Sequence, residues 1–582
     1  MCGIAGIACL PGYRPDEALL GRMAEALAHR GPDGEGFLEA GSAALVHRRL
    51  SIVDLEGGAQ PLVQGPVALV ANGEIYNDPA LRKALPEAPF RTRSDCEAPL
   101  FLWPECNTNY TLELRGMYAI ALLDETGPDV VLALSRDPFG IKPLYFSETD
   151  QGVIFASEPQ ALLATGLVSR AIRPQARDQL LQVQFVAGRE TIYPGIMRVL
   201  PGETLRFVNG VLDDARKRPA CHGAIAENLT EALALSRLDA ALMDSVAAHE
   251  RADVPFGMFL SGGIDSTAVL AAMTRLGNGA PLAWTARFDT GAVDESAQAA
   301  QIAATLGARH RILTVTQEMV WAHLPQIVAA LDDPVADYAV IPSWFLAREA
   351  RKDVTVILSG EGGDELFGGY GRYRRAMRPW WLGGRMPWRR GTLDGLCRLP
   401  TGKAWRRDFV SHDEGSRLRS VQAIDIDQWL PNDLLVKLDR CLMAHAIEGR
   451  TPLLDPVISA LAWTLPDRLK VRGKHGKYLL RRWVEQNVPG SAPFAPKQGF
   501  TVPVGQWIAG QGSRLGPLVA RCAAFQGVIA EETITGIFTR ATGRRERHAA
   551  WVLLFYALWH RIHIETVQSG GDVFDVLSAP RP

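Results

Sequence analysis

The sequence predicts an α/β protein of two halves, a β-rich layered domain followed by a parallel sheet covered by helices. Two observations predict this order. Short apolar runs separated by turn residues fill the first half, whereas helices alternate with buried strands in the second. The irregular stretch 216–233, which contains a Pro-Ala-Cys-His-Gly run, separates them. We therefore expect domains at 1–215 and 234–582, joined by a linker at 216–233.

Bulk composition excludes several classes of protein. The chain has 582 residues, 47% of them apolar and 22% charged, with a net charge of −2. This balance indicates neither a nucleic-acid nor a membrane partner. No apolar run has the length of a membrane-spanning helix, and the first residues lack the basic region of a signal peptide. The eight cysteines form no Cys-x-x-Cys pair, so we expect neither zinc nor a disulfide framework, and a cytoplasmic location.

In the first half, the apolar runs 67–70, 119–123 and 130–134 are typical of strands in a layered domain. Cys2 precedes them. If Met1 is removed, the α-amine of Cys2 becomes the N-terminus and can accept the proton of the thiol on the same residue. A cysteine at this position can equally be a small buried core residue.

The second half reads as helices and strands in turn. Acidic residues at 294–295 suit the start of one helix. We expect helices at 238–248, from 267, at 294–304, at 338–350 and at 549–563, and strands at 254–260, 282–288, 310–315 and 354–358. Strands that alternate with helices form a parallel sheet, whose ligands lie beyond the carboxyl ends of the strands. The segment 372–407, rich in Trp, Pro and Arg, is expected to be a solvated surface excursion with a few buried tryptophans.

The strand at 254–260 is followed by Ser261-Gly262-Gly263-Ile264-Asp265-Ser266 and then a helix. Glycines let the backbone approach an anion, and the N–H groups of the helix start point at it. This pattern indicates a phosphate cradle, although a tight turn with a capping serine is the alternative. It lacks the Gly-Lys-Ser/Thr ending of a Walker A loop. It resembles the pyrophosphate loop of enzymes that cleave ATP between the α and β phosphates.

A second glycine-rich loop, Ser359 to Tyr370, follows the strand at 354–358. Its sequence is Ser-Gly-Glu-Gly-Gly-Asp-Glu-Leu-Phe-Gly-Gly-Tyr, with five glycines and three acids. The alternative is a solvated acidic loop. Its place directly after an apolar strand favours function, because functional loops concentrate at such strand ends.

Further motifs in the first half are His-Arg-Gly-Pro-Asp-Gly at 29–34, Arg-Arg-Leu-Ser-Ile-Val-Asp at 48–54, Asn-Gly-Glu-Ile-Tyr-Asn at 72–77 and Ser-Asp-Cys-Glu at 94–97. Together with Cys2, these motifs resemble those of the N-terminal-cysteine (class II) glutamine amidotransferases. With the loop at 261–266 as well, nearly the whole chain resembles the glutamine-hydrolysing asparagine synthetases. The resemblance implies an αββα N-terminal-nucleophile domain and a doubly wound, parallel-sheet ATP-pyrophosphatase domain.

The resemblance also implies roles in the first half. Cys2 is the nucleophile, and Asn72 and Gly73 supply donors to the oxyanion. Arg49 binds the α-carboxylate of L-glutamine, and Glu74 and Asp95 accept from its α-ammonium, with Asn72 also in the glutamine site. For Arg49 and Asp95 the alternative is a surface salt bridge.

In the second half the resemblance implies a site for ATP with Mg²⁺. Asp265 and Asp364 are the implied metal ligands. Glu361 supports formation and amination of the acyl-adenylate, and Lys497 neutralises charge as pyrophosphate departs. The implied nucleotide contacts are Leu260, Ser261, Gly262, Gly263, Asp265, Ser266, Ala286, Ser359 and Gly360. Ala286 is smaller than the residue usual in the family, and Gly449, Thr451 and Leu453 also differ from the common pattern.

The implied reaction makes L-asparagine from L-aspartate, L-glutamine and ATP through a β-aspartyl-AMP intermediate and internally transferred ammonia. Three alternatives stay open: an amidotransferase acting on another carboxylate such as a sugar acid or peptide, a cyclase related to β-lactam synthetases, and a non-catalytic storage or binding protein. The intact Cys2 and glutamine motifs disfavour the cyclase, and the joint presence of Cys2, Asp265, Glu361, Asp364 and Lys497 disfavours the last. The oligomeric state is open, with a homodimer as the candidate.

Overall fold

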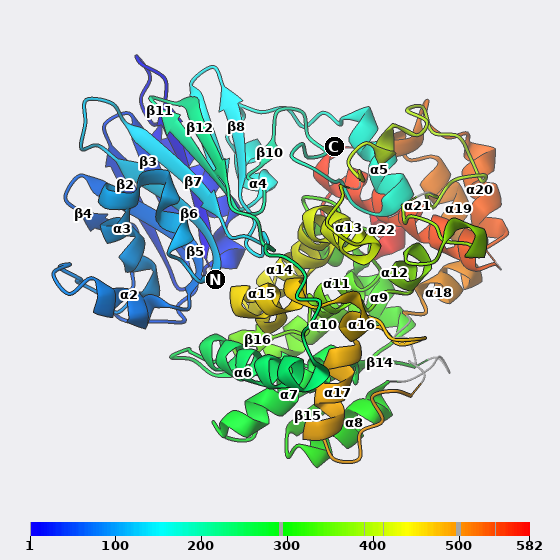
Figure 1. Ribbon diagram of the computed structural model, residues 1–582. Coiled ribbons are helices and arrows are strands. Elements are labelled where there is room, and N and C mark those ends of the chain that lie inside the picture. The colour runs from blue at the N-terminus through cyan, green and yellow to red at the C-terminus, as the bar shows by residue number, and fades with distance from the viewer. Residues whose placement is uncertain are drawn as a thin grey trace.

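The computed structural model describes residues 2–289, 295–388, 390–410, 412–495, 502–541 and 543–581. Figure 1 shows a layered N-terminal half in blue and cyan beside a larger C-terminal half in green to red. The predicted α/β class is confirmed, with two antiparallel sheets in the N-terminal half and one parallel sheet in the C-terminal half. Among the described residues, no helix is both long and apolar enough to cross a bilayer.

The first sheet has the strand order β10-β8-β9-β1-β3-β2. Its strands are β1 (Gly3–Cys9), β2 (Gly34–Ala40), β3 (Ala43–Arg49), β8 (Tyr145–Thr149), β9 (Gly152–Ala156) and β10 (Met197–Arg198). The second has the order β12-β11-β7-β6-β5-β4. Its strands are β4 (Leu62–Gln64), β5 (Val67–Ile75), β6 (Gly116–Asp124), β7 (Val131–Arg136), β11 (Glu203–Val208) and β12 (Val211–Lys217).

Side chains from both sheets interleave in one core, which includes Ile4 and Leu45 of the first sheet and Val70 and Leu134 of the second. Helices cover the outer faces. They are α1 (Glu17–Ala26) and α4 (Pro159–Ala164) on the first sheet and α2 (Asp78–Ala84) and α3 (Ala98–Cys106) on the second, while α5 (Pro174–Val183) leads toward the C-terminal half. This is the αββα layering that the resemblance implied, and it buries the inward faces of both sheets.

The expected linker is shorter in the structure. Residues 216 and 217 still belong to β12, because Lys217 pairs with Glu203 of β11. Helix α6 begins at Glu231, where the Thr230 side chain accepts from the N–H of Leu233 as an N-cap.

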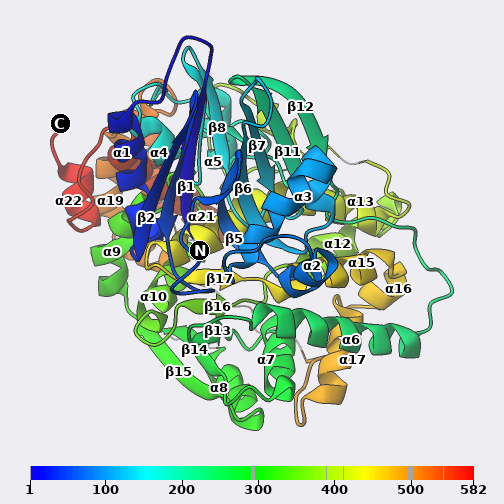
Figure 2. The same ribbon diagram turned by 90° about the vertical axis from the view of Figure 1, so that its left-hand side faces the viewer.

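The third sheet is wholly parallel, with the order β15-β14-β13-β16-β17. Its strands are β13 (Phe256–Phe259), β14 (Leu282–Phe288), β15 (Arg309–Val315), β16 (Val356–Leu358) and β17 (Glu448–Arg450). The helices around it are α6 (Glu231–His249), α7 (Ile264–Leu276), α8 (Ser296–Thr305), α9 (Gln317–Ala329), α10 (Val340–Ala350), α11 (Gly363–Phe367), α14 (Leu435–Met443), α15 (Pro456–Thr464), α16 (Asp467–Lys470) and α17 (Tyr478–Asn487). In Figure 2, β17 lies on the side of this sheet that faces the N-terminal half.

The remaining helices form two groups. Helices α12 (Gly371–Ala376) and α13 (Arg417–Ile424) pack against each other in a small core of their own. A lobe at the C-terminal end of the chain (Figure 1) contains α18 (Val504–Gly510), α19 (Gly512–Ala520), α20 (Glu531–Thr539), α21 (Arg544–His563) and α22 (Val573–Ser578). The predicted helix at 549–563 is confirmed inside α21, whose residues from Ala549 on are almost all buried. It is a packing helix of this lobe.

The segment 372–407 lies largely at the surface, as expected, but one end of it is anchored. It begins inside α12, where Nη2 of Arg372 donates to Asp425 at 2.7 Å. Trp405 is buried, whereas Trp380 and Trp381 are exposed. The charge pattern of the sequence did not reveal this partly buried ion pair, because Asp425 lies in a different element.

Candidate functional site

The nucleophile proposed in the N-terminal half is buried immediately before β1. Cys2 is 8% exposed, and its Sγ lies 4.0 Å from the carbonyl oxygen of Leu50. Its backbone N–H donates to Oδ1 of Asn72 at 3.0 Å, and its carbonyl oxygen accepts from Nε of Arg30 at 3.2 Å. Burial raises the pKa of the Cys2 thiol, so the residue needs a nearby base to act as a nucleophile.

Asn72 is suited to an oxyanion hole. It is fully buried on β5, and its oxygen is already used by Cys2. Its Nδ2 has no hydrogen-bond partner among the described residues, so this donor remains available next to the nucleophile. The neighbouring Gly73 packs against β6, where a Cβ would lie 2.1 Å from the carbonyl oxygen of Met117. A side chain at Gly73 would therefore push β5 away from β6.

Two buried acids stand beside these residues. Oδ2 of Asp95 accepts from the N–H of Ile75 at 2.5 Å, and burial raises the pKa of Asp95 to about 6. Burial and then the neighbouring Asp95 raise the pKa of Glu74 well above its usual value. Because these acids interact with each other, a cation such as the α-ammonium of glutamine would be favoured beside them, in addition to Arg450, which pairs with Glu74.

Arg49 lies at the end of β3, and its guanidinium donates to the carbonyl oxygens of Asp54 at 2.6 Å and Leu55 at 3.1 Å. It also lies near enough to Cys2 to lower the pKa of the thiol, against the larger effect of burial. The structure therefore brings Arg49, Asn72, Gly73, Glu74 and Asp95 to one region around Cys2.

In the C-terminal half, the two glycine-rich loops meet. They follow β13 and β16, which are paired neighbours, so both loops emerge at the same carboxyl edge. A Cβ on Gly360 would lie 2.8 Å from the backbone nitrogen of Ser266. The two loops therefore pack so closely that a side chain at Gly360 would not fit. Gly262 has a φ of +69°, a conformation that favours glycine.

Hydroxyl groups fix the first loop. Oγ of Ser261 lies 3.1 Å from Oγ of Ser266 and accepts from the N–H of Gly263 at 3.3 Å. Other predicted nucleotide contacts lie at the same edge. Leu260 donates its N–H to the carbonyl oxygen of Trp284 at 2.9 Å on β14, which also carries Ala286.

A lysine that the sequence reasoning gave no role joins the predicted metal ligands. Nζ of Lys477, at the start of α17, forms ion pairs with Asp265 and, at 2.8 Å, with Asp364. These two acids raise the pKa of Lys477 against the opposing effect of its burial. The carboxylates thus converge on one point, and two carboxylates with substrate phosphates and waters are a usual set for Mg²⁺. No group of three or more metal-ligating side chains occurs in the described part of the chain.

Glu361 lies in the second loop near Lys437 of α14, which lowers its pKa while burial, the largest effect, raises it. Nζ of Lys437 forms an ion pair with Asp337 at 2.9 Å. Ser359 is buried, and its N–H donates to the carbonyl oxygen of Arg450 at 2.8 Å. Lys497 lies outside the described residues, so its predicted role stays a prediction.

Arg450 links the two sites directly. It is a fully buried residue of β17, and its NH2 forms an ion pair with Glu74 of the N-terminal half at 2.9 Å. Its Nε donates to Glu448 at 2.5 Å. Arg450 therefore contacts Glu74, a residue expected to bind glutamine, through its side chain. Through its backbone it contacts Ser359 of the second glycine-rich loop. The sequence around Arg450 gave no signal of this link, because Glu74 lies in a distant strand.

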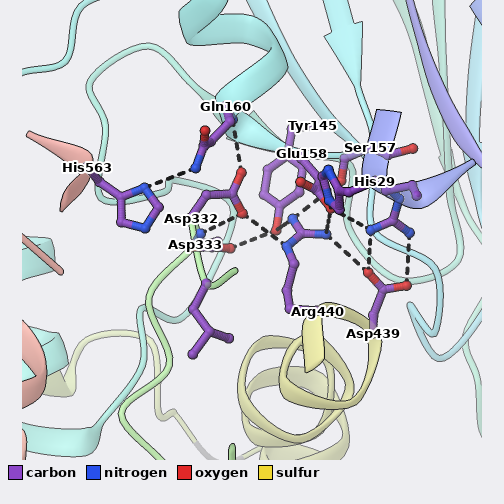
Figure 3. Close-up of polar contacts among 12 residues, drawn as sticks. His29, Tyr145, Ser157, Glu158, Gln160, Asp332, Asp333, Asp439, Arg440 and His563 are labelled. Carbon is purple, nitrogen blue, oxygen red and sulfur yellow. Dashed lines mark hydrogen bonds and ion pairs between the residues drawn. The ribbon is translucent and has the colours of Figure 1, made fainter. Parts of the chain in front are cut away.

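A second link, drawn in Figure 3, centres on Arg440 of α14. Its guanidinium lies 3.3 Å from Glu158 of the N-terminal half and 3.0 Å from Asp332 of the C-terminal half. The adjacent Asp439 holds Arg30 through two hydrogen bonds of 2.8 and 3.0 Å. Because Arg30 also donates to the carbonyl oxygen of Cys2, α14 is connected to the nucleophile.

Two family models match the chain: "Glutamine amidotransferase domain" over residues 1–216 and "Asparagine synthase" over residues 237–561. The chain is 31% identical to asparagine synthetase (glutamine-hydrolysing) 1 of Bacillus subtilis over 622 aligned residues, which cover 97% of each protein. It is 29% identical to asparagine synthetase B of Escherichia coli over 508 residues, or 84% of this chain and 79% of that protein. It is also 30% identical to "Amidase chry2" of Gibberella zeae over 421 residues, or 64% of this chain and 60% of that protein.

Proposed function

The chain belongs to the family of glutamine-hydrolysing asparagine synthetases and is a glutamine-hydrolysing ligase, and we propose that its acceptor is the side-chain carboxylate of L-aspartate. In this proposal the N-terminal half releases ammonia from L-glutamine. The C-terminal half activates aspartate with ATP as β-aspartyl-AMP and releases pyrophosphate, and ammonia then displaces AMP to give L-asparagine.

The observation that carries the proposal is the presence of two groups of suitably placed side chains in one molecule. Cys2 with the free Nδ2 donor of Asn72 supports thioester chemistry on an amide. The loops after β13 and β16, with Asp265, Asp364 and Lys477, support the binding of a nucleoside triphosphate. The buried ion pairs of Arg450 and Arg440 connect the two halves, which supports coupling between the reaction in one half and the reaction in the other.

Mg²⁺ is part of the proposal. Asp265 and Asp364 would hold it, because their carboxylates already converge on a cation, the ammonium of Lys477. Bound there, the ion would neutralise phosphate charge. Lys477 and the hydroxyl groups of Ser261 and Ser266 would hold the nucleotide whether or not the ion is bound.

The test is ATP–pyrophosphate exchange at saturating ATP with a panel of carboxylic acids. L-Aspartate should support exchange at a rate well above that of any other acid. Exchange with a different acid and none with aspartate would contradict the proposal.

The second candidate is an amidotransferase of the same fold acting on another carboxylate, such as a sugar acid or a peptide intermediate. One observation in favour of this candidate is the similarity to a relative named as an amidase. A second is that Gly449, Thr451 and Leu453, beside Arg450, differ from the common family pattern. The same exchange panel separates the two candidates.

A further inference from the structure

One buried carboxylate near the second glycine-rich loop has no partner. Asp433 is fully buried, and neither of its carboxylate oxygens has a hydrogen-bond partner among the described residues. A buried carboxyl group without a partner costs free energy, so its persistence calls for an occupant.

The acids around Asp433 outnumber the lysine that they face. Asp433, Asp337 and Glu361 each interact electrostatically with Lys437, a buried lysine of α14. The lysine forms its ion pair with Asp337, at 2.9 Å. Arg372, a further cation near Asp433, donates instead to Asp425 from both Nε and Nη2. Three acids therefore share one lysine, and among them Asp433 is the fully buried one whose two oxygens have no hydrogen-bond partner in the described part of the chain.

The local backbone is unusual at this point. Asp433 lies at the end of a π-helix, Asp425–Leu434, which contains Pro431 and runs into α14. π-Helical turns are rare and often occur at functional sites. The next turn carries Lys437, so the helix presents Asp433 and Lys437 to the same cluster of acids as Glu361.

We propose that Asp433, with Asp337 beside it, binds the α-ammonium group of the acceptor amino acid and so selects an α-amino acid over other carboxylates. This inference rests on the proposed function, because it takes Glu361 to mark the place where the acceptor carboxylate is activated. A primary ammonium supplies the missing charge and up to three donors to the unpartnered oxygens. Burial raises the pKa of Asp433 well above its usual value, and a cation bound beside the carboxyl group would favour its ionised form.

The experiment compares acceptors in ATP–pyrophosphate exchange. Succinate is aspartate without the amine, and β-alanine is aspartate without the α-carboxylate. We expect the wild-type protein to favour aspartate over succinate. Asp433→Asn should lower kcat/KM for aspartate and β-alanine by roughly 10- to 100-fold, the usual effect of losing a hydrogen bond to a charged group. Succinate, which has no amine, should change by less than about 3-fold.

Asp427→Asn is the matched control, since it makes the same change on the same helix at a side chain that is 56% exposed. It should leave all three acceptors unchanged. An Asp433→Asn protein that keeps the wild-type ratio of aspartate to succinate overturns the inference. If that variant does not fold, equal wild-type rates with succinate and aspartate overturn it. Wild-type exchange with some other acid and none with aspartate would instead overturn the proposed function itself.

Discussion

Glutamine binding should depend on pH because of Asp95. Burial raises the pKa of this carboxyl group to about 6, and only the ionised form can pair with the α-ammonium of glutamine. A group with this pKa is about 90% ionised at pH 7 and about 10% ionised at pH 5. The dissociation constant of glutamine should therefore rise about tenfold as the pH falls from about 7 to about 5. Binding weakens toward low pH because acid protonates Asp95, which must be ionised to pair with the α-ammonium of glutamine.

The assay is calorimetric titration of glutamine into the Cys2→Ala protein. This variant cannot turn glutamine over, and it removes the thiol, so the titration of the nucleophile does not enter the profile. Glutamine keeps the same net charge across this range, which leaves the protein as the source of any change. In the absence of other titrating groups, binding below pH 6 should release one proton, detectable by comparing buffers of different ionisation enthalpy.

The control is Asp95→Asn on the same background, which should bind glutamine more weakly and lose the pH dependence. A dissociation constant that stays level from about pH 5 to pH 7 in the Cys2→Ala protein would refute the reasoning. A pH dependence that survives Asp95→Asn would assign the titration to another group, such as the neighbouring Glu74.

Three further predictions concern the other groups of the two sites. Cys2→Ala should abolish asparagine formation from glutamine and leave formation from ammonium salts intact, as measured by amide yield; loss of both in a folded protein would contradict the arrangement. Glu361→Gln should lower amide formation by roughly 10²-fold at saturating ammonia and leave nucleotide binding unchanged. Asp364→Asn should instead weaken nucleotide binding itself. A wild-type rate of amide formation in Glu361→Gln would show that Glu361 is only a loop residue. Asp439→Asn, which removes the charge that holds Arg30, should lower the glutamine-dependent rate more than the ammonia-dependent rate, and an equal loss of both would mean that the pair serves only the fold.

Local pattern predicted the elements of the parallel sheet well. The strand expected at 282–288 is β14 with the same bounds, and the helix expected from 267 lies inside α7. Ligand-binding loops of a parallel sheet lie at the carboxyl ends of its strands, so the loops at Ser261 and Ser359 were expected at the same edge. The pairing of β13 with β16 confirms this. Such features depend on residues close together in the chain.

Contacts between residues far apart in the chain could not be predicted from the sequence. The ion pair between Glu74 and Arg450 joins two halves of the molecule, and neither flanking stretch indicates its partner. The same holds for Lys477, whose two acids lie in the first turns of α7 and α11. Asp433 carried no signal either, because an unpartnered carboxyl group is a property of the packed structure and not of a motif.

The most direct test of the central claim follows the nitrogen. The protein would receive amide-¹⁵N glutamine, L-aspartate and ATP with Mg²⁺, in the presence of excess unlabelled ammonium, and the product would be analysed by mass spectrometry. The account predicts asparagine whose amide carries the ¹⁵N label with little dilution, together with AMP and pyrophosphate in equal amounts. Asparagine labelled only to the level of the bulk ammonium, or an amide formed on an acid other than aspartate, would contradict it.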